Sequence, residues 1–191
     1  MKYTLALLIV FSFVFMACQK KENTAHDHSS AEAKTEAPVD TVKKSIPKEE
    51  HAQIGGTHLM INYHAPAVRG RTIWGGLVPY DEVWVTGAHS ATSLEIDKDV
   101  MINGTKVPSG KYAFFTIPRQ AKWTLILNKN WDQHLADDYS EKEDVLRFDV
   151  TPETLTTVQE RLKYSIIDKG NSEASIDVSW EKVKVSLPIK L

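Results

Sequence analysis

The segment from residue 70 to residue 92, GRTIWGGLVPYDEVWVTGAHSAT, has the side chains best suited to bind a ligand. Its tryptophans and tyrosine offer flat apolar faces with polar edges, and arginine offers forked donors for carboxylate, phosphate or sugar hydroxyl groups. The glycines let the backbone turn tightly and approach a ligand closely. The candidate ligand-binding residues are Arg69, Arg71, Trp74, Tyr80, Trp84, Thr86, His89 and Thr92. A crossover between two sheets would also need glycine and would bury Trp84, so binding site and scaffold are both open interpretations.

Catalysis is the weaker interpretation of this segment. A hydrolase needs a nucleophile beside a base, or two carboxylates facing each other across a cleft. The acids at positions 81 and 82 are adjacent, so they would point to opposite faces of an extended segment, and Ser90 is only a sequence neighbour of His89. An envelope hydrolase or a metal-binding protein is the alternative to a binding module. Convergence of Arg71, Tyr80, His89 and a carboxylate in one pocket would favour that alternative, and a flat aromatic groove would favour binding.

The chain has seven histidines, and a metal site needs ligands that converge. His58 and His64 fall on one face of an expected strand, but their six-residue separation corresponds to about 20 Å, so they cannot share an ion. His89 could approach either of them across strands, although solvent-facing histidines are the simpler interpretation. His26-Asp27-His28 could hold copper, nickel or zinc loosely in a flexible segment. We expect no dedicated metal site and no cofactor.

The periodicity of the chain predicts that strands position these side chains. THLMINYHA, residues 57 to 65, alternates Leu59, Ile61 and Tyr63 with mostly polar residues, and SLEIDKDVMING, residues 93 to 104, gives two short runs before an Asn-Gly turn. Further short runs are KYAFFTIP, KWTLILNK, DVLRFDVT, RLKYSIID, EASIDVSW and KVKVSLPIK. Eight or nine short strands without an intervening helical pattern predict an all-β fold, an antiparallel two-sheet sandwich or jelly roll.

Two segments depart from this strand pattern. Residues 131 to 143, WDQHLADDYSEKE, predict a polar insertion or a single short helix, and residues 152 to 160 could add a helical turn. Residues 51 to 191 are long enough for one domain with a real core. The formal charge of −2 is balanced and shows no basic stripe, so nucleic acid is not an expected partner.

The N-terminus has the features of an export signal, over residues 1 to 17. Lys2 precedes an apolar run, LALLIVFSFVFM, that is too short for a mature transmembrane helix of about 20 residues. Ala17-Cys18 then resembles the cleavage site of bacterial lipoproteins, with Phe15 in place of the usual Leu or Val. The only cysteine, Cys18, excludes an internal disulfide and suits lipidation. An ordinary signal peptide that leaves a free thiol is the other interpretation.

Residues 18 to 50 predict a lipidated cysteine followed by a disordered tether, because residues 19 to 50 have no aromatic residue and many charges. Gln19-Lys20-Lys21-Glu22 resembles the export signal of Bacteroidetes lipoproteins, and Asp40-Thr41-Val42 resembles the O-glycosylation acceptor of such bacteria. We therefore expect a protein anchored to the outer membrane through Cys18, periplasmic or surface-facing. Its expected partner is a small molecule, a glycan or a protein.

Several motifs of the domain resemble a known family. Gly70-Arg71, LVPYDEVWVTGAHSAT, VPSGKYAFFTIP and WTLILNK are similar to exported bacterial proteins grouped as domain of unknown function 2911, common in Bacteroidetes. The resemblance covers about residues 53 to 189 and implies a β-rich fold and export, without an agreed chemistry. In that family's pattern Arg usually follows the Trp and Asn usually follows Gly-Ala, where this chain has Val85 and His89. If the family's ligand uses those two residues, this chain binds something different or nothing.

Overall fold

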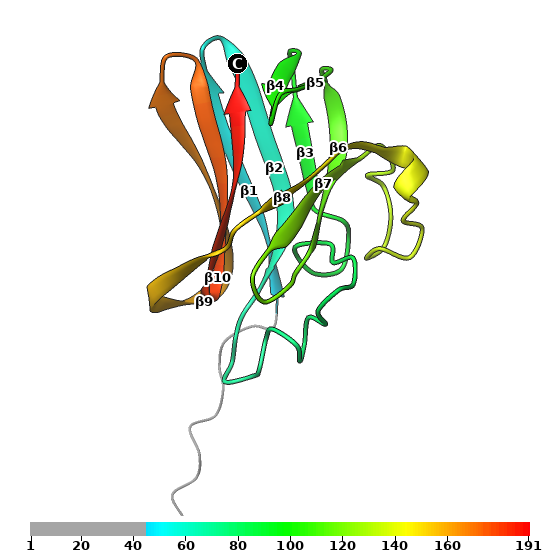
Figure 1. The fold of residues 1–191 in the computed structure, drawn as a ribbon, viewed down its shortest axis with the longest axis vertical. Helices are drawn as coiled ribbons and strands as arrows, with labels where there is room; N and C mark the ends of the chain where they lie inside the picture. The colour runs from blue at the N-terminus through cyan, green and yellow to red at the C-terminus, as the bar shows by residue number, and fades with distance from the viewer. Residues whose placement is uncertain (1–44) are drawn as a thin grey trace, which may run out of the picture. The chain divides into compact units, whose positions relative to one another are not determined.

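The computed structural model describes residues 45 to 191, which form two antiparallel β-sheets packed as a sandwich (Figure 1). The six-stranded sheet has the order β1-β2-β3-β6-β7-β8, and the four-stranded sheet has the order β5-β4-β10-β9. The first sheet consists of β1 Ser45–Ile54, β2 Thr57–Pro66, β3 Ser93–Ile96, β6 Gly110–Ile117, β7 Trp123–Asn128 and β8 Asp144–Val150. The second consists of β4 Val100–Ile102, β5 Thr105–Val107, β9 Glu153–Gly170 and β10 Glu173–Lys190. The predicted all-β, two-sheet architecture is confirmed.

The predictions for the N-terminal segment lie outside the described residues; they concern the signal peptide, Cys18, the tether up to residue 44, His26-Asp27-His28 and Thr41. The predicted domain start at residue 51 was too late, since β1 begins at Ser45. All of β1 pairs with β2, from Ser45 opposite Pro66 to Ile54 opposite Thr57, so backbone pairing orders a segment that has little to bury. Within residues 45 to 191, no helix is long and apolar enough to cross a membrane.

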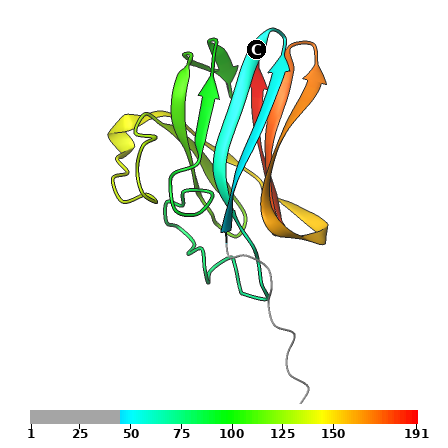
Figure 2. The same ribbon diagram turned by 180° about the vertical axis from the view of Figure 1, so that it is seen from behind.

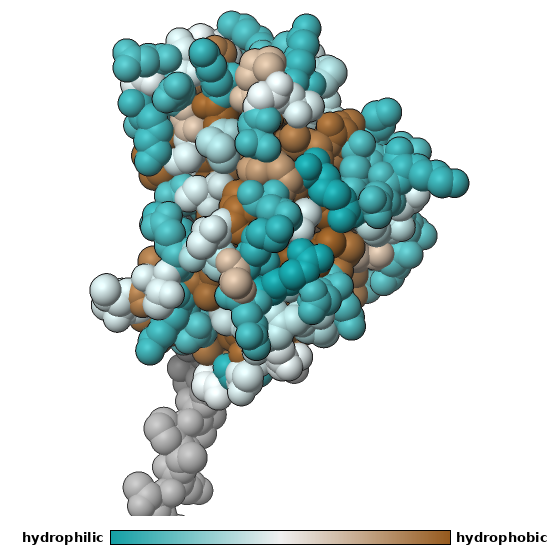
Figure 3. All heavy atoms as spheres, viewed as in Figure 1, coloured by the Kyte–Doolittle hydropathy of each residue, from teal (hydrophilic) through white to brown (hydrophobic). Residues whose placement is uncertain are grey.

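Alternation along the strands places the main core between the two sheets. Leu59, Ile61 and Tyr63 of β2 are buried, whereas the residues between them are partly exposed, as the period of two requires. The ring of Tyr63 lies 4.6 Å from the ring of Tyr164 in β9, which joins one sheet to the other. On the face shown in Figure 3, hydrophilic side chains are widespread and apolar ones show between them. Burial of the inner faces, at about 25 cal/mol per Å² of apolar area, stabilises the sandwich.

The sequence prediction was wrong in two places in the C-terminal half. Residues 152 to 160 do not form a helical turn but begin β9, where Glu153 pairs with Lys184 and Gln159 with Glu181. TLTTVQ is rich in β-branched residues, which favour strands over helices. EASIDVSW and KVKVSLPIK form one strand, β10, which continues through an irregularity at Glu181 with φ 53°. Joining these two runs removes one predicted strand, but β1 and β5, which were not predicted, bring the described residues to ten strands instead of eight or nine.

The predicted turn and insertion are both present in the described part of the chain. Asn103 and Gly104 have φ 47° and 77°, and positive φ at both positions is the pattern of the tight turn that joins β4 to β5. Residues 131 to 143 form an irregular polar insertion with a single 3-10 turn, Glu141–Glu143, and no α-helix.

A second apolar cluster lies on the outer face of the six-stranded sheet. Alternate residues of β6 point to opposite faces, so Phe114 joins the main core and Phe115 joins the outer cluster. The members of the outer cluster are Val85, Ala91, Ala113, Phe115, Ile117 and Ile126, with Val83, Trp84, Ala136 and Tyr139 packed against them. Residues 83 to 91 and the insertion therefore cover this face together, and both lie at the same side of the sheet in Figure 2.

Candidate functional site

The segment VTGAHSAT, residues 85 to 92, forms a loop inserted into the ladder beside β6. Trp84 pairs with Thr116 of β6, and Ser93 pairs with Ala113. Eight residues lie between Trp84 and Ser93, whereas β6 has two residues between the matching positions, so the loop must project from the sheet. Trp84 and Thr116 exchange backbone hydrogen bonds of 2.8 and 3.0 Å, which fix one end of the loop.

Thr86 holds the base of this loop in an unusual backbone conformation. Its φ is 51°, in the left-handed region that β-branched residues rarely adopt, and its side chain is fully buried. The carbonyl oxygen of Thr86 accepts hydrogen bonds from the Tyr164 hydroxyl at 2.8 Å and from Thr92 Oγ1 at 3.1 Å. The hydroxyls of Thr86 and Thr116 lie 3.0 Å apart and share a further bond. These bonds offset a conformational cost of about 1 to 3 kcal/mol.

Gly87 lets the loop lie directly against β2. A Cβ at this position would lie 2.7 Å from Thr92 Oγ1 and 3.3 Å from the carbonyl oxygen of His64. The first distance is shorter than real Cβ contacts allow, so only glycine fits without a shift of its neighbours. The segment from residue 70 to residue 92 therefore needs this glycine for close packing between chain segments.

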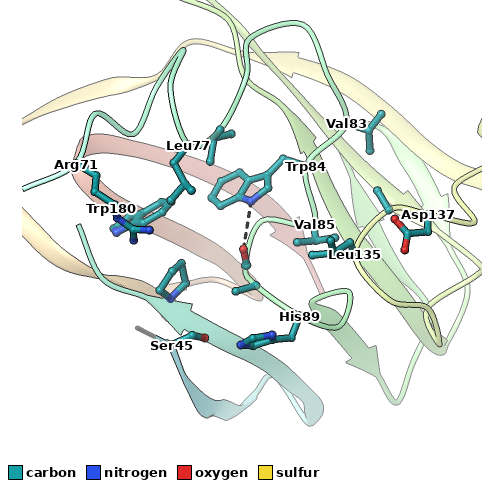
Figure 4. Close-up of a pocket in the computed structure, with 15 residues that line it drawn as sticks. Ser45, Arg71, Leu77, Val83, Trp84, Val85, His89, Leu135, Asp137 and Trp180 are labelled. Atoms are coloured by element: carbon teal, nitrogen blue, oxygen red, sulfur yellow. Dashed lines mark hydrogen bonds between the residues drawn. The ribbon is translucent and has the colours of Figure 1, made fainter. Parts of the chain in front are cut away.

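A cavity of about 570 Å³ opens beside the loop (Figure 4). In the view of Figure 4, Arg71, Leu77 and Trp180 lie on one side of it, Leu135 and Asp137 lie on the other, and Trp84 lies between them. The lining residues are Ser45, Pro66, Arg71, Leu77, Val78, Val83, Trp84, Val85, Gly87, Ala88, His89, Leu135, Ala136, Asp137 and Trp180. Most of these side chains are apolar, and the charged groups are few.

Four tryptophans pack together behind the cavity. Trp84 stacks on Trp180 with ring centres 5.7 Å apart and planes at 20°, and Trp74 meets both edge-on at 5.7 and 5.8 Å. Trp74 also lies 4.8 Å from Trp123 of β7. The Trp84 indole nitrogen donates to the carbonyl oxygen of Gly87 at 3.2 Å, which ties the cluster to the loop. Trp74 thus serves the scaffold, whereas Trp84 belongs both to the core and to the cavity wall.

The two candidate arginines have different positions. Arg71 lines the cavity and is exposed, and its guanidinium donates from Nε to Val68 O at 3.1 Å and from Nη2 to Ala67 O at 2.5 Å. Since a guanidinium has five N–H donors, other donors of Arg71 remain for a ligand. Arg69 does not line the cavity; its backbone nitrogen donates to Glu160 Oε1 at 2.9 Å.

The structure brings together three of the eight candidate site residues. Arg71, Trp84 and His89 line the cavity, and the other five do not. Tyr80 packs its ring against Gly75, where an added Cβ would lie 2.9 Å from the ring. Thr86 and Thr92 are fully buried and hold the loop. One segment therefore contributes some residues to the cavity wall and others to the scaffold, and Trp84 contributes to both.

Sequence reasoning missed several lining residues. Leu77 and Leu135 are large apolar residues that stay 47% and 39% exposed, a property that the sequence pattern does not reveal. Trp180 reaches the cavity from β10, more than 90 positions beyond His89 in the chain. Asp137 belongs to the insertion, and its carboxylate pairs with His134 Nδ1 at 3.0 Å. For the residues of the insertion, the only signal available in the sequence was the polar composition of residues 131 to 143.

Comparison with known families agrees with the sequence resemblance. The model of the family described as "Protein of unknown function (DUF2911)" matches residues 19 to 189. The chain belongs to the DUF2911 family. No curated protein and no solved structure matches it. The matched residues of this DUF2911 protein include the whole cavity lining, from Ser45 to Trp180.

In this DUF2911 protein a polar network orders the insertion that forms one wall of the cavity. Asn128 Nδ2 donates to Ser140 O at 2.9 Å and to Asp144 Oδ1 at 2.7 Å. The Tyr139 hydroxyl donates to Asp144 Oδ2 at 2.8 Å, and Arg147 donates to that hydroxyl. Burial, together with the neighbouring Asp144 carboxylate, raises the pKa of Tyr139 to about 12. The backbone nitrogen of Leu135 donates to His89 O at 2.7 Å, which joins insertion and loop.

The described part of this DUF2911 protein has no cluster with the usual number of metal ligands. Between residues 45 and 191, no group of three or more His, Cys, Asp or Glu side chains is placed to hold an ion. Two pairs of histidine rings do meet: His51 with His58 at 6.0 Å between centres, and His64 with His89 at 5.1 Å.

Proposed function

We propose that this DUF2911 protein is a lipid-anchored cell-envelope module that binds a small amphipathic ligand in the cavity beside Trp84. The ligand has an apolar body and a hydrogen-bond acceptor group, and the cavity binds an anionic acceptor more tightly than a neutral one. The observation that carries this proposal is the lining, in which a mostly apolar surface includes the guanidinium of Arg71.

The apolar part of the proposal is supported by exposed side chains at the cavity. Leu77 and Leu135 are two of the six large apolar residues that stay exposed within residues 45 to 191, and both line this cavity. Full burial of a leucine side chain contributes about 1.5 to 3 kcal/mol, so covering these half-exposed residues would give part of that gain. Concave, mostly apolar pockets with a few polar groups are typical of small-molecule sites.

The acceptor group is supported by the exposed guanidinium of Arg71, which lines the cavity. Arg71 adds a positive charge with donors left over, and charge-assisted hydrogen bonds are about twice as strong as neutral ones.

Binding has more support than catalysis in this cavity. Arg71, His89 and Asp137 line it together, but Tyr80 lies outside it. Among the described residues, no hydrogen bond joins Arg71, His89 and Asp137 to one another, and Asp137 already pairs with His134. A general base acts within about 2.6 to 3.2 Å of the group that it deprotonates, and these three residues form no such pair with one another.

The ligand proposal can be tested by calorimetry with two probes of the same shape, 2-naphthoate and 2-naphthylmethanol. We expect both to bind, with 2-naphthoate the tighter. Arg71→Ala should remove most of that difference, and Leu135→Glu should weaken both probes. Val158→Glu is the matched control, because Val158 is 50% exposed on β9 and does not line the cavity. If Val158→Glu weakens binding as much as Leu135→Glu, the cavity is not the site.

The anchor is supported by Ala17-Cys18 after the apolar run. Each buried methylene of an attached lipid contributes about 0.8 kcal/mol to membrane binding, so loss of the lipid should release the protein. We expect Cys18→Ser to move the protein from the membrane fraction to the soluble envelope fraction or to leave it unprocessed. Normal cleavage with unchanged membrane partitioning would show that Cys18 is not lipidated.

A further inference from the structure

His64 and His89 bring two imidazole rings together at the edge of the cavity. The ring centres lie 5.1 Å apart and the ring planes meet at 81°. His64 is half-buried on the outer face of β2, and His89 is exposed on the loop and lines the cavity. Neither ring forms a hydrogen bond with another residue between 45 and 191, unlike the ring of His134, which pairs with Asp137.

The separation of the two rings fits one shared ion. With a metal–nitrogen distance of about 2.1 Å and a ring nitrogen about 1.1 Å from the ring centre, each centre lies about 3.2 Å from the ion, and a tetrahedral angle places the centres about 5.2 Å apart. The observed distance is 5.1 Å. The rings of His51 and His58, at 6.0 Å, would need an angle of about 140° at the ion, far from tetrahedral.

The backbone holds both histidines in place. His89 has φ 65°, in the left-handed region, and its carbonyl oxygen accepts a hydrogen bond from Leu135 N at 2.7 Å. The next residue, Ser90, forms an isolated antiparallel bridge with His134. The loop packs against β2 so closely that a Cβ on Gly87 would lie 3.3 Å from the carbonyl oxygen of His64. Ligands held on a rigid backbone lose little freedom when an ion binds.

We propose that His64 and His89 bind a divalent transition-metal ion of the Zn²⁺ class, with water in the remaining positions. Imidazole suits this class of ion, and open positions are usual where a site has few protein ligands. This proposal does not rest on the ligand proposed above, although His89 also lines that cavity.

The test is titration of the full chain with Zn²⁺ alone, followed by calorimetry. All samples carry Cys18→Ser, His26→Ala and His28→Ala, because these N-terminal side chains could bind the ion themselves. We expect one Zn²⁺ per chain and a loss of affinity of about tenfold or more for His64→Ala and for His89→Asn. Asn lacks the imidazole but tolerates positive φ, so His89→Asn should keep the loop conformation.

His58→Ala is the matched control, because His58 lies on the same face of β2 as His64 but not beside His89. It should leave Zn²⁺ affinity unchanged. Electron paramagnetic resonance of the Cu²⁺ complex should show two nitrogen ligands in the parent chain and fewer in His64→Ala. Absence of Zn²⁺ binding to the parent chain, or an equal loss in His58→Ala, would overturn the proposal. Because the probe is the metal alone, failure of naphthoate binding leaves this result unaffected.

Discussion

Gly87→Ala should destabilise the domain through steric conflict at the base of the loop. The added methyl group would lie 2.7 Å from Thr92 Oγ1, the atom that donates to the carbonyl oxygen of Thr86. It would also lie 3.3 Å from the carbonyl oxygen of His64 in β2. Gly87 is not among the residues with positive φ, so the expected cost comes from space and not from backbone conformation.

The magnitude follows from two contributions. Displacing Thr92 weakens one buried hydrogen bond, which is worth about 0.5 to 1.5 kcal/mol. Overpacking a well-filled site costs about 1 to 3 kcal/mol. The carbonyl oxygen of Thr86 keeps its bond from the Tyr164 hydroxyl, so no orphaned acceptor adds to the cost. We expect the free energy of unfolding to fall by about 2 to 4 kcal/mol.

Urea unfolding of four proteins tests this reasoning: the parent, Gly87→Ala, Thr92→Ala and the double variant. Thr92→Ala removes the atom that the new methyl group would meet, so the double variant should cost at least about 1 kcal/mol less than the sum of the single variants. Gly104→Ala is the control that measures the cost of positive φ without a steric conflict, because Gly104 has φ 77° and nothing within 4 Å of its added Cβ. Effects of Gly87→Ala and Thr92→Ala that add to within about 0.5 kcal/mol would refute the steric explanation.

Three further predictions follow from the site. Trp84→Ala should lower the free energy of unfolding by about 3 kcal/mol in urea titration, because this half-buried ring packs against both apolar clusters, whereas Trp84→Phe should cost less. Arg71→Ala should cost about 1 kcal/mol in the same assay, since its guanidinium donates to two backbone carbonyls of the turn before it; a cost near zero would show that these bonds are not made in solution. The pKa of Tyr139 is about 12 in the folded chain and near 10 in the unfolded chain. Its contribution to stability is therefore complete below pH 10 and is lost as the pH rises towards 12. Thermal unfolding between these pH values should show the decline, and Tyr139→Phe should make it shallower.

Local patterns of the sequence predicted the strands that have one buried face. The alternation of Leu59, Ile61 and Tyr63 requires one face of β2 to be apolar, and an Asn-Gly pair favours a tight turn with positive φ. The pattern failed at residues 153 to 160, where most side chains of β9 are exposed and no alternation marks a core face. What holds this part of β9 is its pairing with β10, a contact that the local sequence does not encode.

The candidate site was predicted in part for a similar reason. Arg71, Trp84 and His89 belong to one segment and were found by residue type. Trp180 and Leu135 reach the cavity from β10 and from the insertion, and their arrival depends on the order of strands in the two sheets. Sequence spacing also placed His58 and His64 too far apart for one ion, but it could not show that the loop returns His89 to His64.

The loop between Trp84 and Ser93 sets limits on how relatives of this protein can diverge. Thr86 and Gly87 are buried and hold the loop against β6 and β2, so changes there would damage the fold itself. Ala88, His89 and Ser90 are less constrained by packing, and two of them face the cavity. Evolution can therefore exchange the chemistry of the cavity at positions 88 and 89 while the rest of the fold stays intact. An alignment of relatives sorted by ligand preference should show its variation at positions 88 and 89 and little at positions 86 and 87.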